Sequence, residues 1–532
     1  MIRYLKKVKF EIAVSGILSL IEALCISYYP HLLSNIIDNF ASLKRKDLLM
    51  IFSSFILSVL LILLVIYLEK LVRAKYEKKI CFMLRKDVFN GVIRMDYMCF
   101  HQKKEETYSS FLINDVDQIY ALYFENILFL MSEILMLITY SVILALLNWQ
   151  MCIIIMGSLI LFLLIPRLVG KKYAQYNQVL SGVKADYLSR CEELLSAHDL
   201  IDSRNEERLL AIYNQALDNM QGKQYALKRY RSFVQTFSAS TLYFQLLLCF
   251  IAGLLFSYLG VITLGVFASC LLYVEYVAQY SSNIVNEFLE IRSSRSYRDR
   301  LQELLGDYYS RVECICSEIE TLSLEKLSYA VNGKTLLKNV SFQFEKGKKY
   351  LITGANGTGK STLLQIMAGL IKPSGGRVLL NGREICNYCD MGYIPQRRYL
   401  FEGSLLDNIT LFSETVSSKD MERVRTLCAM VNLDYSPTHY ITRGGTNLSG
   451  GEIAKICLIR EMFMDRSLLL IDEPLNDIDE NSERDILDFL LGLEKTVVIV
   501  AHGLRTSEQF NCILTIKDSE IVTINSSDSS FM

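Results

Sequence analysis

The sequence predicts an all-α membrane domain of six helices followed by an α/β domain with a phosphate-binding loop. Nearly all the long apolar runs of the 532-residue chain lie before residue 285. From Leu322 onward the pattern changes to short β-rich runs that alternate with helices. A glycine-rich loop at residues 354–362 directly follows one of these runs. We therefore expect a membrane domain over residues 1–290, a linker over 291–320 and the α/β domain over 321–532.

The composition narrows the possible functions. Hydrophobic residues make up 51% of the chain and charged residues 21%, against roughly 25% charged residues in an average soluble domain. The 56 Lys and Arg residues nearly balance the 57 Asp and Glu residues, so whole-chain charge gives no indication of a nucleic-acid partner. The 14 cysteines are scattered, which favours reduced thiols over a disulfide framework.

Six apolar runs predict helices in a lipid bilayer. The clearest is Leu48–Leu68, which contains no charge and is long enough to cross the bilayer core. The others are Ile12–Tyr29, Ile127–Leu147, Met151–Leu168, Phe233–Leu259 and Ile262–Tyr280. The first of these carries Glu22 and lacks a small-residue cleavage site, so it does not resemble a signal peptide.

The distribution of Lys and Arg predicts the orientation in the membrane. Both residue types are frequent before the first run and in the long segments 69–126 and 169–232, but absent from the turns at 148–150 and at Gly260. The triplet Lys44–Lys46 is the exception. Because cytoplasmic loops are enriched in these residues, we expect both termini, both long segments and the α/β domain on the cytoplasmic side of the cell membrane.

The loop after the strand-like run 349–353 matches the GxxxxGK[ST] pattern of ATP-binding proteins. Glycines let consecutive backbone N–H groups point at phosphate oxygens at the start of a helix. Lys360 is expected to reach the β- and γ-phosphates of ATP, and the Ser361 hydroxyl is expected to bind Mg²⁺. The loop consists of Gly354, Ala355, Asn356, Gly357, Thr358, Gly359, Lys360, Ser361 and Thr362.

A second motif supplies an acidic pair. Four apolar residues, 468–471, predict a buried parallel strand that ends at Asp472 and Glu473. Asp472 suits Mg²⁺, and Glu473 is placed to accept a proton from an attacking water. An acidic pair after a strand is weak evidence alone, because helix N-caps look alike, but it is strong evidence behind a phosphate loop.

With these motifs the chain resembles an ATP-binding cassette (ABC) transporter of the exporter type. The most specific element is Leu448-Ser449-Gly450-Gly451-Glu452, which matches the family signature LSGGQ except for its final Glu. The resemblance covers essentially the whole length and implies a type I exporter membrane domain fused to a P-loop NTPase domain. It also implies that the signature loop of one subunit contacts the γ-phosphate of ATP held by the other.

Further site residues come from the same resemblance. Gln396 matches the Q-loop glutamine, which senses Mg²⁺ and water. Asp479 matches the last residue of the D-loop, and His502 matches the switch histidine that contacts the γ-phosphate. The adenine-stacking residue is either Tyr329 or Val331, with Tyr329 preferred.

Two further sets of residues concern the coupling of the domains and a possible metal site. The segments around Asp115 and Arg204 are the best candidates for coupling the two domains. Cys386 and Cys389 form a single CxxC without a second pair or histidine partners, which is poor evidence for zinc.

One chain supplies half of the family's usual assembly. Because it keeps both Glu473 and a good signature loop, we expect a homodimer with two working sites, with a heterodimer as the alternative. Met1 lies shortly before the first apolar run, so we expect no leader-cleaving peptidase domain.

The cargo prediction depends on charged and aromatic residues inside the apolar runs. Intramembrane carboxylates usually face a cavity or a partner. Together with tyrosines of the last run they suit a cationic peptide or amphipathic compound; hydrogen bonding between neighbouring helices explains them equally well. The residues are Glu22, Glu133, Glu275, Tyr273 and Tyr276. The expected function is export driven by ATP hydrolysis; a lipid flippase and a non-transporting membrane regulator are the alternatives.

Overall fold

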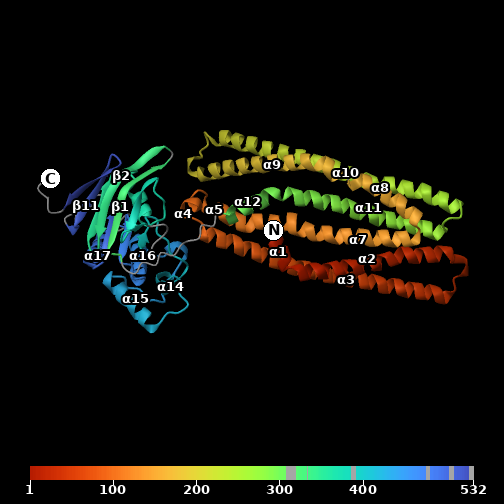
Figure 1. The fold of residues 1–532 in the computed structure, drawn as a ribbon, viewed down its shortest axis with the longest axis horizontal. Helices are drawn as coiled ribbons and strands as arrows, with labels where there is room; N and C mark the ends of the chain where they lie inside the picture. Colours follow the sequence, from red (N-terminus) through yellow and green to blue (C-terminus); the bar gives the residue numbers. More distant parts are fainter. Residues whose placement is uncertain are drawn as a thin grey trace. The chain divides into compact units, whose positions relative to one another are not determined.

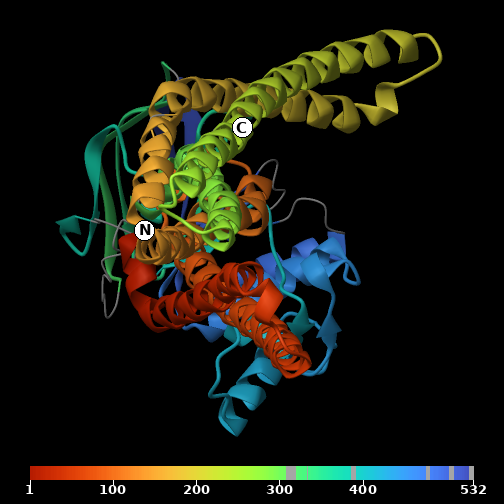
Figure 2. The same ribbon diagram turned by 90° about the vertical axis from the view of Figure 1, so that its right-hand side faces the viewer.

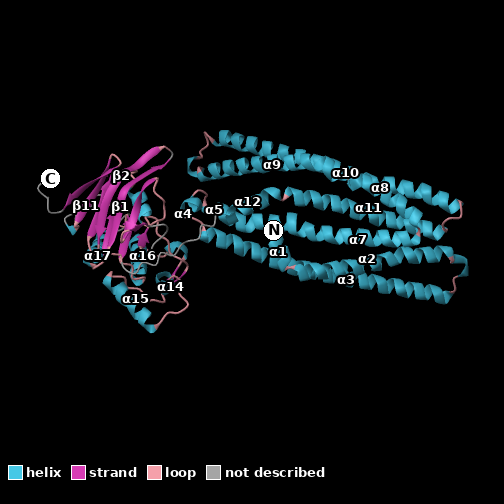
Figure 3. Ribbon diagram, in the orientation of Figure 1, coloured by secondary structure: helices cyan, strands magenta, loops and turns pink. Residues whose placement is uncertain are grey.

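The structure is a computed structural model that describes residues 1–163, 165–306, 319–331, 333–384, 391–474, 480–501 and 509–525. The described chain divides into two compact units (Figure 1). The first holds Met1–Ile93 together with the described residues from Lys103 to Gly306, and the second holds Arg94–Gln102 together with the described residues from Ile319 onward. In the described residues the first unit is built of helices, whereas the second combines strands and helices (Figure 3).

Long helices make up most of the first unit. They are α2 (Lys9–Asp38), α3 (Arg45–Arg94), α7 (Asn126–Leu147), α8 (Trp149–Leu163), α9 (Ile165–Ser196), α10 (Glu206–Tyr258) and α11 (Leu264–Ser293). The shorter elements are α1 (Ile2–Lys7), η1 (Phe40–Ser42), α5 (Glu105–Ser110), η2 (Phe111–Asp115), α6 (Val116–Ile119), η3 (Tyr120–Glu125), η4 (His198–Leu200) and α12 (Arg295–Gly306).

Four helical stretches of the described chain are long and apolar enough to cross a membrane. They are Lys9–Asp38, Arg45–Arg94, Glu105–Leu147 and Glu206–Tyr258. The two remaining apolar runs fall on α8 with the start of α9, and on α11. The helix α11 contains Glu275 and three further charged residues near its C-terminal end, which lower its mean hydropathy.

The helix α11 is the centre of the first unit, because it packs against α2, α7, α8, α9 and α10. The face of α2 that it meets carries small side chains, which let two helices approach closely. Ser269 donates a hydrogen bond to the Pro30 carbonyl at 2.6 Å, and Tyr273 donates one to the Ser27 carbonyl at 3.0 Å. The small buried residues of α2 are Ser15, Ser19, Ala23, Ser27 and Ser34.

The helices α9 and α10 pack along each other. The hairpin that they form near η4 projects away from the other helices of the first unit (Figure 2). Leucines of this hairpin are largely exposed, including Leu195 at 73% and Leu200 at 75%.

The second unit is built on three sheets. The six-stranded sheet has the order β12-β11-β3-β10-β9-β6, the four-stranded sheet the order β2-β1-β4-β5, and β7 pairs with β8. Strand bounds are β1 (Thr321–Val331), β2 (Lys334–Glu345), β3 (Lys349–Gly354), β4 (Gly375–Leu380), β5 (Arg383–Glu384), β6 (Gly392–Ile394), β7 (Gly403–Ser404), β8 (Tyr440–Ile441), β9 (Leu468–Asp472), β10 (Thr496–Val500), β11 (Cys512–Lys517) and β12 (Glu520–Asn525).

Helices cover the sheets and complete two apolar cores. They are α4 (Tyr97–His101), α13 (Lys360–Met367), α14 (Leu405–Thr410), α15 (Ser418–Met430), α16 (Gly450–Phe463) and α17 (Glu480–Gly492), with η5 (Arg443–Gly445) before α16. The strands β3, β10 and β9 are parallel neighbours, and Val500 is in register with both Ile352 and Asp472. Their C-terminal ends therefore lie at one edge of the sheet, which brings the loop after β3 close to Asp472.

Candidate functional site

The loop between β3 and α13 has the backbone that a phosphate loop requires. Gly354 has a φ of +147°, and a Cβ there would lie 2.8 Å from the Ile516 carbonyl oxygen. Gly359 caps α13 in a left-handed conformation with a φ of +97°. Only glycine adopts these conformations without strain, so the loop turns sharply and directs the free N–H groups of α13 into it.

The side chain of Lys360 lies across this loop. Its Nζ donates hydrogen bonds to the carbonyl oxygens of Gly354 and Ala355, both at 3.0 Å. Burial lowers the pKa of Lys360, while the nearby carboxylates of Glu473 and Asp472 oppose that shift. The ammonium group is thus held at the mouth of the loop, where the phosphates of a nucleotide would lie.

Asp472 ends β9 beside the start of α13. The Ser361 hydroxyl donates a hydrogen bond to Asp472 Oδ1 at 3.1 Å. Burial raises the pKa of Asp472, and the hydrogen bond from Ser361 partly offsets this. The hydroxyl and the carboxylate form a pair of hard oxygen donors, which is the ligand chemistry that Mg²⁺ prefers.

Glu473 follows in a strained conformation with a φ of +47°, which is uncommon for a residue with a side chain. Its N–H donates to the Val500 carbonyl at 2.9 Å, which fixes the backbone against β10. Gln396 Nε2 donates to Glu473 Oε2 at 2.7 Å, and Arg398 donates to the Glu473 carbonyl at 2.9 Å. The structure therefore brings together the predicted residues Lys360, Ser361, Gln396, Asp472 and Glu473.

The signature residues Ser449, Gly450 and Gly451 form the N-terminus of α16. Ser449 is the N-cap, and its hydroxyl accepts a hydrogen bond from the N–H of Glu452, whose carboxylate accepts from the Ser449 N–H at 2.7 Å. Tyr435 donates to the other carboxylate oxygen of Glu452 at 2.7 Å. Burial alone would raise the pKa of Glu452, but these hydrogen bonds outweigh it and hold the pKa below its usual range. The final Glu of the signature is therefore an ionised part of the cap.

We expect Ser449→Ala to lower the free energy of unfolding by about 1 kcal/mol, because α16 loses its N-cap. Ser449→Thr retains a capping hydroxyl and is expected to stay close to the unmodified protein. Thermal unfolding of the purified full chain without nucleotide measures both changes. Equal loss in the two variants would show that the hydroxyl does not act as the cap.

The two candidates for the adenine-stacking residue differ in their exposure. Tyr329 is only 8% exposed and packs in the core between β1, β2 and α13, whereas Val331 is 40% exposed at the end of β1. A stacking side chain must present a free face to the base. Val331 presents more of its side chain to solvent than the preferred Tyr329 does, and the choice between them stays a prediction.

Some predicted residues lie outside the described part of the chain. These are Asp479 and His502, as well as the cysteines Cys386 and Cys389.

The candidate cargo residues do not gather at one point. Tyr273 is fully buried and hydrogen-bonded to α2, while Glu275 is exposed on the same helix. Tyr276 is half-buried and stacks on Tyr140, with ring centroids 5.3 Å apart. Glu22 is half-buried, and the charged groups that act on it are Glu69 and Arg73. Glu22 thus interacts electrostatically with Glu69 and Arg73 of α3.

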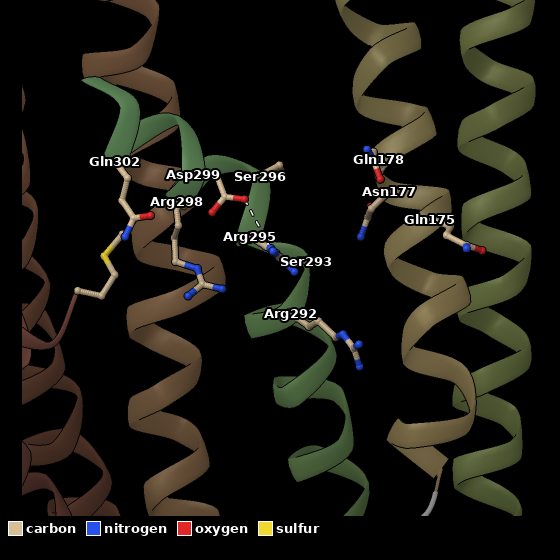
Figure 4. Close-up of a pocket in the computed structure, with 11 residues that line it drawn as sticks. Gln175, Asn177, Gln178, Arg292, Ser293, Arg295, Ser296, Arg298, Asp299 and Gln302 are labelled. Atoms are coloured by element: carbon tan, nitrogen blue, oxygen red, sulfur yellow. Dashed lines mark ion pairs between the residues drawn. The ribbon is translucent and has the colours of Figure 1, made fainter. Parts of the chain in front are cut away.

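A hollow of about 920 Å³ opens in the first unit between α9 and the α11–α12 junction (Figure 4). Three arginines and Asp299 line one side, and three amide side chains line the other. Asp299 pairs with Arg295 at 3.5 Å. The arginines are Arg292, Arg295 and Arg298, and the amides opposite are Gln175, Asn177 and Gln178. Its charge is therefore predominantly positive.

Two family models match the chain. The model for the ABC transporter transmembrane region matches residues 12–281, and the ABC transporter model matches residues 337–476. The chain belongs to the ABC transporter family. It is a fusion of an exporter-type transmembrane region and an ABC-type ATPase domain, as the sequence predicted.

Individual relatives and a solved structure agree with this family. The chain is 26% identical over 278 residues to a lactococcin transport/processing protein of Lactococcus lactis. The aligned residues cover 49% of this chain and 39% of that protein. A lactococcin-G-processing and transport protein of the same species is 24% identical and covers 93% of this chain and 72% of that protein. The ATP-bound structure of a bacterial Atm1-family ABC exporter has a TM-score of 0.82 at 17% identity and covers 98% of this chain and 96% of that chain. The chain thus spans well under half the length of the first curated relative.

Sequence reasoning missed one contact of the ATPase domain. The short helix α4 comes from the segment after α3 but belongs to the second unit. Gln365 of α13 donates a hydrogen bond to the Tyr97 hydroxyl at 3.2 Å, and the Tyr97 ring packs against the core. Asp115 and Arg204, the expected coupling positions, belong to the first unit. The aromatic run Tyr97–His101 in an otherwise basic segment was the available signal.

Proposed function

We propose that this ABC protein hydrolyses ATP to export a peptide or an amphipathic compound across the cytoplasmic membrane. One observation carries the proposal: Glu473 is held by Gln396 beside Asp472, Ser361 and Lys360. In this arrangement Lys360 binds the β- and γ-phosphates, and Glu473 accepts a proton from the water that attacks the γ-phosphate. A protein that only senses ATP has no need of such a base.

The same residues fit Mg²⁺. Ser361 Oγ and Asp472 Oδ1 lie 3.1 Å apart, and Gln396 keeps its amide oxygen free for a cation because its nitrogen donates to Glu473. When bound, Mg²⁺ would neutralise charge on the β- and γ-phosphates. We therefore assign Ser361, Asp472 and Gln396 as the residues that would hold it.

We further propose that two copies of the chain act together. Ser449 is exposed at the start of α16, with the free N–H groups of a helix N-terminus beside it. Such a terminus binds a phosphate, yet the chain already has its own phosphate loop at α13. The projecting α9–α10 hairpin with exposed Leu195 and Leu200 also favours a second copy as partner.

Relatives support the cargo class. Their names describe lactococcin transport and, for a Bacillus subtilis protein 24% identical over 82% of this chain, probable multidrug resistance. A peptide and a small amphipathic molecule share an apolar body with polar groups. The membrane unit offers both kinds of contact, since the Tyr276 ring stacks on Tyr140 and the Glu133 carboxylate is half-buried in the same unit.

Reconstitution into inside-out vesicles tests this function. We expect steady-state ATP hydrolysis and ATP-dependent accumulation of an amphipathic peptide inside the vesicles. A fluorescent phospholipid in the same vesicles separates peptide export from lipid movement. Hydrolysis without accumulation of either probe would contradict transport of these classes.

A further inference from the structure

A single arginine of the first unit interacts electrostatically with several carboxylates, four of which lie on four different long helices. They come from four helices: Glu22 from α2, Glu69 from α3, Glu133 from α7 and Glu287 from α11. The arginine is Arg73 of α3. We refer to these five side chains as the carboxylate cluster. Glu69 follows the second predicted span directly, and Glu133 lies near the cytoplasmic end of the third, so the cluster lies where a molecule from the cytoplasm would enter the membrane.

The contacts inside the cluster leave much of its charge unmatched. Arg73 donates to Glu69 at 2.7 Å, and its guanidinium group also lies over the Phe129 ring at 3.9 Å. Among the described residues, the hydrogen-bond donor to Glu133 is neutral: the Asn283 amide, at 3.1 Å. Ionised, the four carboxylates carry three more negative charges than the one arginine balances.

Two carboxylate oxygens have no partner at all in the described part of the chain. They are Oε2 of Glu133 and Oε2 of Glu287, both buried. Glu287 is 8% exposed, and it interacts electrostatically with Glu133 and Arg73. A buried polar atom without a hydrogen bond is costly, and a buried unpaired charge more so. Glu287 therefore points to a missing positive partner at this place.

The spacing of the acids argues for an organic cation and against a metal ion. In the described chain, no three acidic, histidine or cysteine side chains lie close enough to hold one ion together. An ammonium or guanidinium group carries several N–H donors, which reach separate carboxylates. Glu22 and Glu133 are only half-buried, so the cluster has an accessible side.

We propose that the carboxylate cluster binds the ammonium or guanidinium group of the transported molecule. The inference rests on the proposed export function and adds the charge of the cargo to it. Glu133 and Glu287 make the decisive contacts, because their free oxygens accept the N–H donors, while Arg73 holds Glu69 in place. A neutral cargo leaves both oxygens unpaired and binds less well.

A pair of dansyl probes tests the charge dependence. Dansylcadaverine carries a primary ammonium, and its N-acetyl derivative has the same apolar body without the charge. Fluorescence titration of the purified full chain, without nucleotide, gives the affinity for each. We expect Glu133→Gln and Glu287→Gln to weaken binding of the amine about tenfold each, as for a hydrogen bond to a charged group, with no change for the acetylated probe.

Glu275→Gln is the matched control, because it removes the same charge from the exposed side of α11. It is expected to leave both affinities unchanged. Should Glu287→Gln fail to fold, Glu133→Gln gives the same comparison. Equal weakening in Glu275→Gln, or equal affinity of the unmodified protein for both probes, would overturn the proposal.

A comparison of amine binding in sodium chloride and in choline chloride, at equal ionic strength, tests whether the cluster binds an inorganic ion instead. Displacement of the amine by sodium alone would assign the cluster to that ion and also overturn the proposal. Because amine binding is measured without ATP, a loss of binding can be distinguished from a failure of the export function. A chain that binds the amine but accumulates no probe in vesicles would contradict the export function and leave the binding proposal standing.

Discussion

Glu473→Gln is expected to leave ATP binding nearly unchanged and to lower the rate of ATP hydrolysis by about 10² to 10⁴-fold. That range is the usual contribution of a general base. Glutamine has the size of the glutamate and keeps an amide oxygen for the hydrogen bond that Gln396 donates at 2.7 Å. It has no carboxylate to accept a proton from water. Lys360 and Ser361, which hold the phosphates and the metal, are untouched.

Steady-state phosphate release and equilibrium binding of a fluorescent ATP analogue separate the two effects. Glu414→Gln provides the control, since Glu414 is exposed in the loop before α15 and its substitution removes the same charge. A hydrolysis rate in Glu473→Gln within a few-fold of the unmodified rate would refute the assignment of the base.

The nucleotide site was largely predictable because its geometry is local. The phosphate loop needs only a strand, glycines at fixed spacing and a helix, all within residues 349–367. The acidic half of the site, Asp472 and Glu473, was predictable because the apolar run of a buried strand ends where these two acidic residues begin. Their proximity to Lys360 follows from the parallel pairing of β9, β10 and β3.

Which of Tyr329 and Val331 is the more exposed was not predictable, because it depends on strand register. The pairing of β1 with β2 shifts between Leu324 and Leu327 and twice more around Tyr329. Each irregularity changes which side chains face the core, and alternation in the sequence cannot reveal it. Tyr329 consequently faces inward, and Val331 is the more exposed residue.

The carboxylate cluster was missed for a different reason. Of its acids, Glu69 and Glu287 lie outside the apolar runs, so a search for charges inside spans finds only Glu22 and Glu133. The helices α3 and α11 continue past these runs without a break. Only the packing of the helices shows that all four acids interact electrostatically with Arg73.

Lys360→Ala is expected to weaken ATP binding by at least tenfold and to abolish measurable hydrolysis. Among the described side chains of the site, Lys360 is the cation on the loop, and its ammonium already points along the loop through Gly354 and Ala355. Bound phosphates would replace those carbonyl oxygens with charged acceptors, and hydrogen bonds to charged groups contribute about 1.5–3 kcal/mol each. The Lys360→Ala variant cannot form these hydrogen bonds and loses their contribution to the binding free energy.

The loss is expected to be larger for hydrolysis than for binding. Charge accumulates on the phosphate oxygens as the reaction proceeds, so the ammonium stabilises the transition state more than bound ATP. Lys360→Arg retains the charge but not the compact shape of the ammonium. Because Lys360 is 5% exposed, the larger guanidinium does not fit, and we expect arginine to restore little activity. Lys419→Ala, an exposed charge removal at the start of α15, is expected to change neither quantity, and an equal loss there would attribute the effect to net charge instead of to the loop.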